Sequence, residues 1–227
     1  MTLDLFREFK WSDGTGTLVP VSFPAIFPDM TRYQAEIDQA HVNQGQDTWK
    51  LNAAQVANHV ATDTHLLNWR GNTQAVVVSG GGSNDSDAVV TVENPAQTGN
   101  KIKVTLQRLE GNTNGGLWEV VSVTASGMSI TSPQSRDILS SPVNVAGTGY
   151  AFKGVIGTVD VLDHLYTPIG HARVTSATGN GNSTFSKVVS YTTTFKGGKQ
   201  DGLVVLYAAN NAGSSNGAAV MVKELLG

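Results

Sequence analysis

Two aspartates in a glycine-rich segment are the residues of this chain that come nearest to a metal site. The segment 80–87 reads GGGSNDSD and combines flexible backbone with side-chain oxygens, including the carboxylates of Asp85 and Asp87. Calcium prefers oxygen ligands of this kind, but the segment lacks the sixth-position glycine and the distal glutamate of an EF-hand loop. We interpret it as a hairpin loop between two valine runs. The sequence predicts no cofactor and leaves open weak calcium binding by these two carboxylates.

The serines and histidines that could act in catalysis do not show the spacing of a known catalytic motif. The segment 213–217, GSSNG, has the letters of a nucleophile elbow, but that motif needs a helix after the serine, and a strand is expected here. The five histidines show no metal-ligand spacing. We therefore predict no catalytic residue, and we keep open a hydrolase or enzyme inhibitor with a site between two domains. Such a site would combine four residues that only the fold could bring together: Asp63, His65, Asp163 and His164.

Aromatic side chains are the remaining candidates for binding, because they offer rigid contact area and can stack on other rings. Five of them are interaction candidates: Phe6, Trp11, Phe23, Phe27 and Tyr166. The first four lie in a proline-containing arm, residues 1–29, which either packs on the chain's own first domain or reaches a neighbouring subunit. A carbohydrate-binding module is a further alternative, and it would need two or more coplanar exposed aromatics on one sheet face.

The composition limits the class of protein and its partners. The chain has 227 residues, 25 glycines and only 15% charged residues, which favours two small domains made of strands and tight turns. The net charge is −3, and the 15 lysines and arginines are scattered singly, so we expect no nucleic-acid partner. The absence of cysteine excludes disulfides and thiolate nucleophiles.

The uncharged run 202–222 is long enough for a membrane span, but its middle is rich in asparagine, serine and glycine, so we expect two strands and no transmembrane segment. The first residues do not resemble a signal peptide. We expect a mature chain from which such a peptide has been removed.

The N-terminal part, residues 30–131, is predicted to be an α+β domain. Thr31 and Gln34 form a capping-box pattern at the start of a first helix, and a second helix should run from Asn52 to the glycine at position 71, with Leu67 on its apolar stripe. Strand patterns follow at 74–79, 87–93, 101–109 and 117–125. The two helices should therefore cover an antiparallel meander.

The C-terminal part, residues 138–227, is predicted to be a β-sandwich after a short linker at 132–137. Strands are expected near 142–146, 152–162, 169–177, 184–195, 202–208 and 218–224, with no helix between them. The linker is too short for independent motion, so the two domains should share a small fixed interface. The fold class is mainly β.

Residues 138–226 resemble the immunoglobulin-like domain of bacterial spore-germination proteins. The marks of the resemblance, in chain order, are SPVNVAG at 141–147, AFKG at 151–154, VDVLD at 159–163, Phe185 before a strand, and VMV at 220–222. The family commonly has an acidic residue where this chain has Lys153. The resemblance implies an immunoglobulin-like sandwich on a secreted or envelope-anchored bacterial protein, with no catalytic role.

We therefore expect a non-enzymatic, exported bacterial protein of the cell envelope or the extracellular space. Its role would be structural, adhesive or in protein interaction, with protein partners or self-association into a multimer or filament through sheet edges or the arm. Carbohydrate is the alternative ligand.

Overall fold

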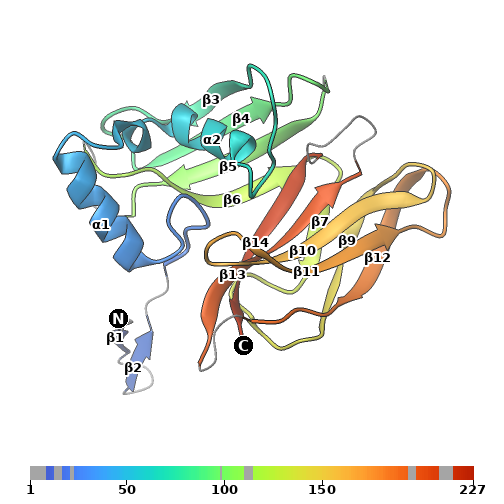
Figure 1. Ribbon diagram of the computed structural model, residues 1–227. Coiled ribbons are helices and arrows are strands. Elements are labelled where there is room, and N and C mark those ends of the chain that lie inside the picture. The colour runs from blue at the N-terminus through green and yellow to red at the C-terminus, as the bar shows by residue number, and fades with distance from the viewer. Residues whose placement is uncertain are drawn as a thin grey trace.

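The fold is taken from a computed structural model of the chain (Figure 1). The structure describes residues 9–12, 17–20, 23–97, 99–109, 115–193, 198–209 and 217–227.

The N-terminal part holds one hairpin and three short helical elements. Strands β1 (Phe9–Ser12) and β2 (Thr17–Pro20) pair antiparallel as a two-stranded sheet. The helices follow as α1 (Arg32–Asn43), the 3₁₀ helix η1 (Thr48–Leu51) and α2 (Ala53–Thr62).

The capping residues predicted from the sequence begin both α-helices. Thr31 accepts a hydrogen bond from the backbone N–H of Gln34, whose side chain in turn accepts from the backbone N–H of Thr31, so the capping box at α1 is confirmed. At α2, the side chain of Asn52 accepts a hydrogen bond from the backbone N–H of Gln55. The predicted length of α2 is wrong: the helix ends at Thr62, and Leu67 is buried in the turn that follows.

Four strands form the predicted meander, and α2 packs on it (Figure 1). They are β3 (Gln74–Gly80), β4 (Asp87–Glu93), β5 (Lys101–Gln107) and β6 (Glu119–Ala125). Buried and solvent-facing residues alternate along β5, which confirms one buried and one wet face.

From residue 129 onward, the described residues form eight strands, and two of these were not predicted. They are β7 (Ser129–Ser132), β8 (Ile138–Leu139), β9 (Val143–Ala151), β10 (Val155–Asp163), β11 (Pro168–Thr175), β12 (Gly181–Val189), β13 (Gln200–Ala208) and β14 (Ala219–Leu226). The unpredicted strands are β7 and β8, which are short and lie around the expected linker.

A nine-stranded sheet runs through both parts of the chain. Its order is β11-β10-β13-β14-β6-β5-β4-β3, with β8 paired in parallel to β14 beside this path. The three-stranded sheet, β12-β9-β7, lies against the β10, β13 and β14 portion of the large sheet (Figure 1). The C-terminal half of the chain is therefore a two-layered, sandwich-like arrangement. The two parts join in the large sheet through a single residue pair, Met221 with Val123.

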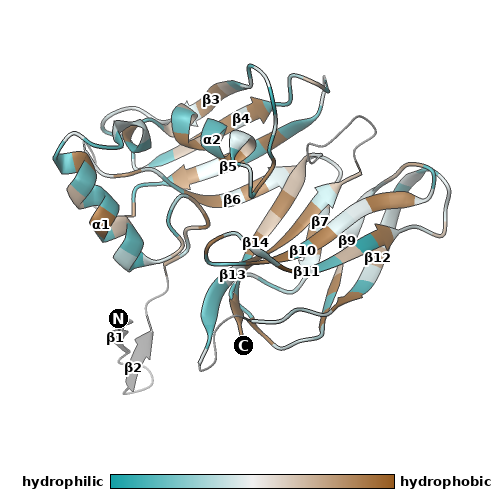
Figure 2. Cartoon of the chain, in the orientation of Figure 1, coloured by the Kyte–Doolittle hydropathy of each residue, from teal (hydrophilic) through white to brown (hydrophobic). Residues whose placement is uncertain are grey.

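Strand β13 is buried on both faces and supplies the core on each side. Val204 and Leu206 face the core between the two sheets, whereas Leu203 and Val205 belong to the core beneath α2. Hydrophobic residues are concentrated in the strands, and α1 is mostly hydrophilic (Figure 2). The mainly β fold with two α-helices and a large antiparallel sheet is therefore confirmed, while the immunoglobulin-like assignment remains a prediction.

The segment 23–30 fills the gap where β6 and β14 diverge. The backbone N–H of Ile26 donates to the carbonyl of Val120, and the N–H of Val120 donates to the carbonyl of Phe27, each at 2.7 Å. From β14, the buried amine of Lys223 donates to the carbonyl oxygens of Phe23 and Met30. This segment therefore connects the meander to the last strand of the chain.

Candidate functional site

The two ends of the nine-stranded sheet differ in how they are protected. Strand β3 forms one end, and its valines Val76, Val77 and Val78 are 57, 44 and 61% exposed. The strand contains no charged residue and no proline. A β-bulge at Val78, between the pairs that β3 makes with β4, is the one irregular position along this edge. An uncharged apolar edge strand is a template for pairing with another strand.

Strand β11 forms the other end and is protected in several ways. It begins with Pro168 and carries His171 and Arg173. The segment after β12 covers this edge: the backbone N–H of Thr192 donates to the carbonyl of Ile169 at 3.2 Å, and an isolated bridge joins Gly170 to Tyr191. Proline, charge and covering chain are the usual devices that block strand addition. Among the described residues, β3 is therefore the open edge of this sheet, with the bulge at Val78 as its one protecting feature.

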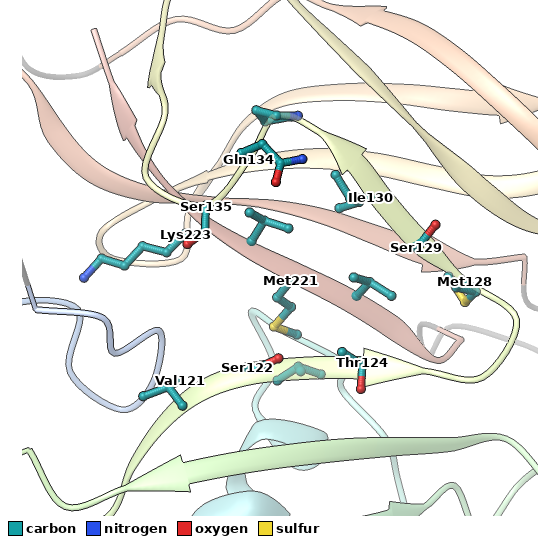
Figure 3. Close-up of a pocket in the computed structure, with 14 residues that line it drawn as sticks. Val121, Ser122, Thr124, Met128, Ser129, Ile130, Gln134, Ser135, Met221 and Lys223 are labelled. Atoms are coloured by element: carbon teal, nitrogen blue, oxygen red, sulfur yellow. The ribbon is translucent and has the colours of Figure 1, made fainter.

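A groove of about 320 Å³ lies between β6, β7 and β14 (Figure 3). Ser122 and Thr124 line it from β6, and Met128 and Ile130 line it from the β7 side. The one charged residue among its lining residues is Lys223, whose amine points away from the groove toward the segment 23–30. The groove therefore presents no acid or base for proton transfer.

A cluster of ionisable side chains is buried where the N-terminal segment meets η1 and β6. It consists of Asp29, Asp38, Lys50 and Glu119, named here the junction cluster. The Lys50 amine forms ion pairs with Asp38 and, at 3.6 Å, with Asp29, and the backbone N–H of Asp29 faces the Glu119 carboxylate at 3.5 Å. Lys50, Asp29 and Glu119 are at most 6% exposed.

The pKa values in the junction cluster follow from burial and from the contact of two acids. Burial and the neighbouring Asp29 charge raise the pKa of Glu119 well above its usual range. Burial also raises the pKa of Asp29, although the Lys50 charge opposes that shift. Burial and the Asp29 charge therefore favour the protonated form of Glu119. A shared proton between two carboxyl groups is a chemically competent arrangement, but these groups are enclosed by the chain's own segments and the groove does not reach them.

A second buried acid lies between the two sheets. Glu224 on β14 is fully buried, and no hydrogen bond of normal geometry reaches either of its carboxyl oxygens. Burial raises its pKa to about 8, with a further contribution from the charge of Asp137. The side chain of Gln200, diagonally across on β13, is also buried without a hydrogen-bond partner. Glu119 and Glu224 were both missed in the sequence, because an isolated charged residue in a strand normally faces solvent.

Three of the predicted interaction residues lie inside the chain. Phe23 and Phe27 are 8 and 6% exposed. The hydroxyl of Tyr166 faces the carbonyls of Ile26 and Pro28, each at 3.0 Å, and its ring centroid lies 5.9 Å from that of Phe27. These aromatics thus connect the β10–β11 turn with the N-terminal segment.

The other two interaction candidates, Phe6 and Trp11, lie near the start of the chain. Phe6 lies outside the described residues, and Trp11 is on β1, where only the strand itself is described.

The candidates for an interdomain site are engaged in local turns. Asp63 accepts a hydrogen bond from the backbone N–H of His65 at 2.8 Å, and Asp163 accepts from the N–H groups of Leu165 and Thr167, each at 2.9 Å. None of the four candidate residues, which also include His164, lines the groove described above. The elbow-like segment 213–217 lies, except for its last residue, outside the described residues.

The carboxylates of the glycine-rich segment are held by the loop itself. Asp85 accepts from the backbone N–H of Gly82 at 2.8 Å, and Asp87 accepts from Ser86 and Gln107. The two hydrogen bonds to Asp87 lower the pKa of its carboxyl. Across the described part of the chain, no group of three or more histidine, aspartate or glutamate side chains is placed to hold a metal ion.

In the same part of the chain, no helix is both long enough and apolar enough to cross a membrane. No family model, no curated protein and no solved structure matches this chain.

Proposed function

We propose that this chain is a non-enzymatic interaction protein that associates with a second copy of itself through the open edge of β3. As part of the same proposal, it is exported to the bacterial cell envelope or the extracellular space, and residues 138–226 form an immunoglobulin-like module. The contrast between the open edge of β3 and the protected edge of β11 carries the proposal.

A second copy fits the β3 edge because the strand is self-complementary. Two β3 strands in antiparallel pairing are related by a two-fold axis, and such a contact closes after two subunits. The pairing would place Val76 and Val78 against valines of the other copy, with no charge in either strand to oppose the approach. Main-chain hydrogen bonds would extend the nine-stranded sheet across the dimer.

Solution mass measured by light scattering over a range of protein concentrations tests this proposal. We expect the mass of the wild-type chain to rise from monomer to dimer. The double variant Val76→Lys, Val78→Lys should remain a monomer, because two edge lysines from each copy would face one another across the interface. Leu165→Lys is the matched control, since Leu165 is 59% exposed in the β10–β11 turn, and it should dimerise like the wild type.

A wild-type chain that stays monomeric at every concentration would overturn the proposal. So would a lysine double variant that dimerises as strongly as the control. Circular dichroism of each variant checks that its fold is retained.

A further inference from the structure

The outer face of the β12-β9-β7 sheet has an unusual chemical character. The even-numbered residues of β9 and β12 point outward, because the odd-numbered residues Val143, Val145, Phe185 and Val189 lie in the core between the sheets. From β9 and β12 the outward positions are Asn144, Ala146, Thr148, Tyr150, Asn182, Thr184, Ser186 and Val188. None of these eight side chains is charged, and five carry an amide or an aliphatic hydroxyl. We call this surface the outer face.

Two aromatic rings lie at one end of the outer face. Tyr150 is 59% exposed, and Phe152, two residues further along, is 41% exposed. Phe152 directly follows the last residue of β9, so both rings lie near the same end of the outer face. Reciprocal backbone hydrogen bonds of 2.9 and 3.0 Å between Phe152 and Val155 hold the second ring in a tight hairpin. The rings are therefore exposed but fixed to a rigid element.

Polar groups surround these rings and are held in a regular register. Asn182 is the cross-strand partner of Tyr150, and Thr184 is the partner of Thr148. Ser186 donates a hydrogen bond to the Asn144 side chain at 2.9 Å, which fixes the far end of the face. The outer face thus combines ring surface with amide and hydroxyl groups over the width of two strands.

We infer that the outer face binds a neutral glycan, with Tyr150 and Phe152 stacking on its sugar rings and the neighbouring amide and hydroxyl side chains bonding to its hydroxyl groups. A sugar ring has apolar C–H surfaces and a rim of hydroxyls, so it needs an aromatic platform together with uncharged donors and acceptors. The eight outward positions of β9 and β12 carry no charge, which favours a neutral polymer over an anionic one, and the Lys153 amine lies 5.4 Å from the centroid of the Phe152 ring at the end of the face. A flat sheet face suits an extended chain of sugars, whereas a single sugar would need a concave pocket.

This inference is independent of the proposed dimer. The outer face belongs to the three-stranded sheet, whereas β3 is the end of the other sheet. Each proposal can therefore fail without affecting the other.

Native affinity electrophoresis tests the inference with defined probes. The gels contain a soluble neutral glucan, a soluble chitin derivative without charge, a neutral mannan or, as the anionic comparison, alginate. We expect at least one neutral probe to retard the wild-type chain more than alginate does. Tyr150→Ala with Phe152→Ala should weaken that retardation about tenfold or more, because the double variant removes both stacking surfaces.

The matched control removes an exposed aromatic elsewhere. Tyr33 on α1 is 46% exposed, and Tyr33→Ala should be retarded like the wild type. A second variant, Thr184→Asp, keeps both rings but adds a charge to the face, and it should also lose most of the retardation. Retardation by no neutral probe, equal retardation of the double alanine variant, or stronger retardation by alginate would each overturn the inference.

Discussion

The junction cluster and Glu224 bury acids in different ways. At the junction, Asp29 and Glu119 share their environment with the Lys50 amine, which forms ion pairs with two carboxylates. In the described part of the chain, no basic side chain contributes to the pKa shift of Glu224, and no hydrogen bond of normal geometry reaches its carboxyl oxygens. A buried charge is tolerated when it is paired, and a buried acid without a base keeps its proton instead. The comparison indicates that the junction cluster is an ionic connection between segments, whereas Glu224 is held in its neutral form.

The largest expected effect comes from changing Glu224 to Gln at alkaline pH. The pKa of Glu224 is about 8 in the folded chain and lies near 4.5 for an ordinary glutamate, so the folded state binds the proton more tightly. Its stabilising contribution is complete below pH 4.5 and is lost as the pH rises toward 8. We expect Glu224→Gln to remove this loss and to be more stable than the wild type at pH 9 by on the order of 4 kcal/mol.

Chemical denaturation across pH 4 to 9 measures this difference. The pKa values of Asp29 and Glu119 are also raised, so these acids also lower the free energy of unfolding as the pH rises. The wild type and Glu224→Gln are therefore compared at each pH. Parallel stability curves for the wild type and Glu224→Gln would contradict the assignment of the proton to Glu224.

The next effect is expected from Lys50→Met, which leaves the acids of the junction cluster without their base. Breaking a buried ion pair by removing one partner destabilises a protein by about 3 kcal/mol or more, because the remaining charge stays buried. Equilibrium urea unfolding at pH 7 measures the loss. Lys101→Met is the control: Lys101 is half-exposed and pairs with Glu93 at 3.0 Å, and its loss should have an effect of less than about 1 kcal/mol. Equal effects in the two variants would show that Lys50 does not act as a buried counter-charge.

The smallest effect on stability is expected from Glu119→Gln. Because burial and the Asp29 charge favour the protonated form of Glu119, an amide of the same shape should change the free energy of unfolding at pH 7 by less than about 1 kcal/mol. Glu119 lowers the pKa of Asp29 through a side-chain hydrogen bond, and a glutamine amide can donate in its place, so the pKa of Asp29 should shift little. Carboxyl NMR titration of Asp29 in both proteins measures this shift. An Asp29 pKa that falls in the variant, as it would when a neighbouring negative charge is removed, or a large loss of stability at pH 7, would place the negative charge on Glu119.

Local patterns predicted many of the elements that are now seen. The capping residues Thr31 and Asn52 marked the helix starts, and the alternation along β5 marked its buried face. The same reasoning extended α2 through Leu67, because an apolar residue at helical spacing is buried whether it lies in a helix or in the turn after it. Helix length was therefore less certain than helix start.

The features that depend on distant pairing could not be predicted from the sequence. Lys50, Glu119 and Glu224 look like solvated charges in the sequence, and only their neighbours in the fold show that they are buried. The open edge of β3 likewise follows from strand order, since a run of three valines is typical of a central strand as well. For the outer face, the spacing of Tyr150 and Phe152 was visible in the sequence, but the side of the sheet that it faces was not.

The single residue pair between β6 and β14 has a mechanical consequence. Hydrogen bonds that share a load resist a pulling force together, and here the sheet offers one pair, Met221 with Val123, across the join. The segment 23–30 is held on one side by Val120 and on the other by the amine of Lys223. If tension were applied between the two halves, the hydrogen bonds of that segment would share it with this pair and with the apolar core that packs across the join.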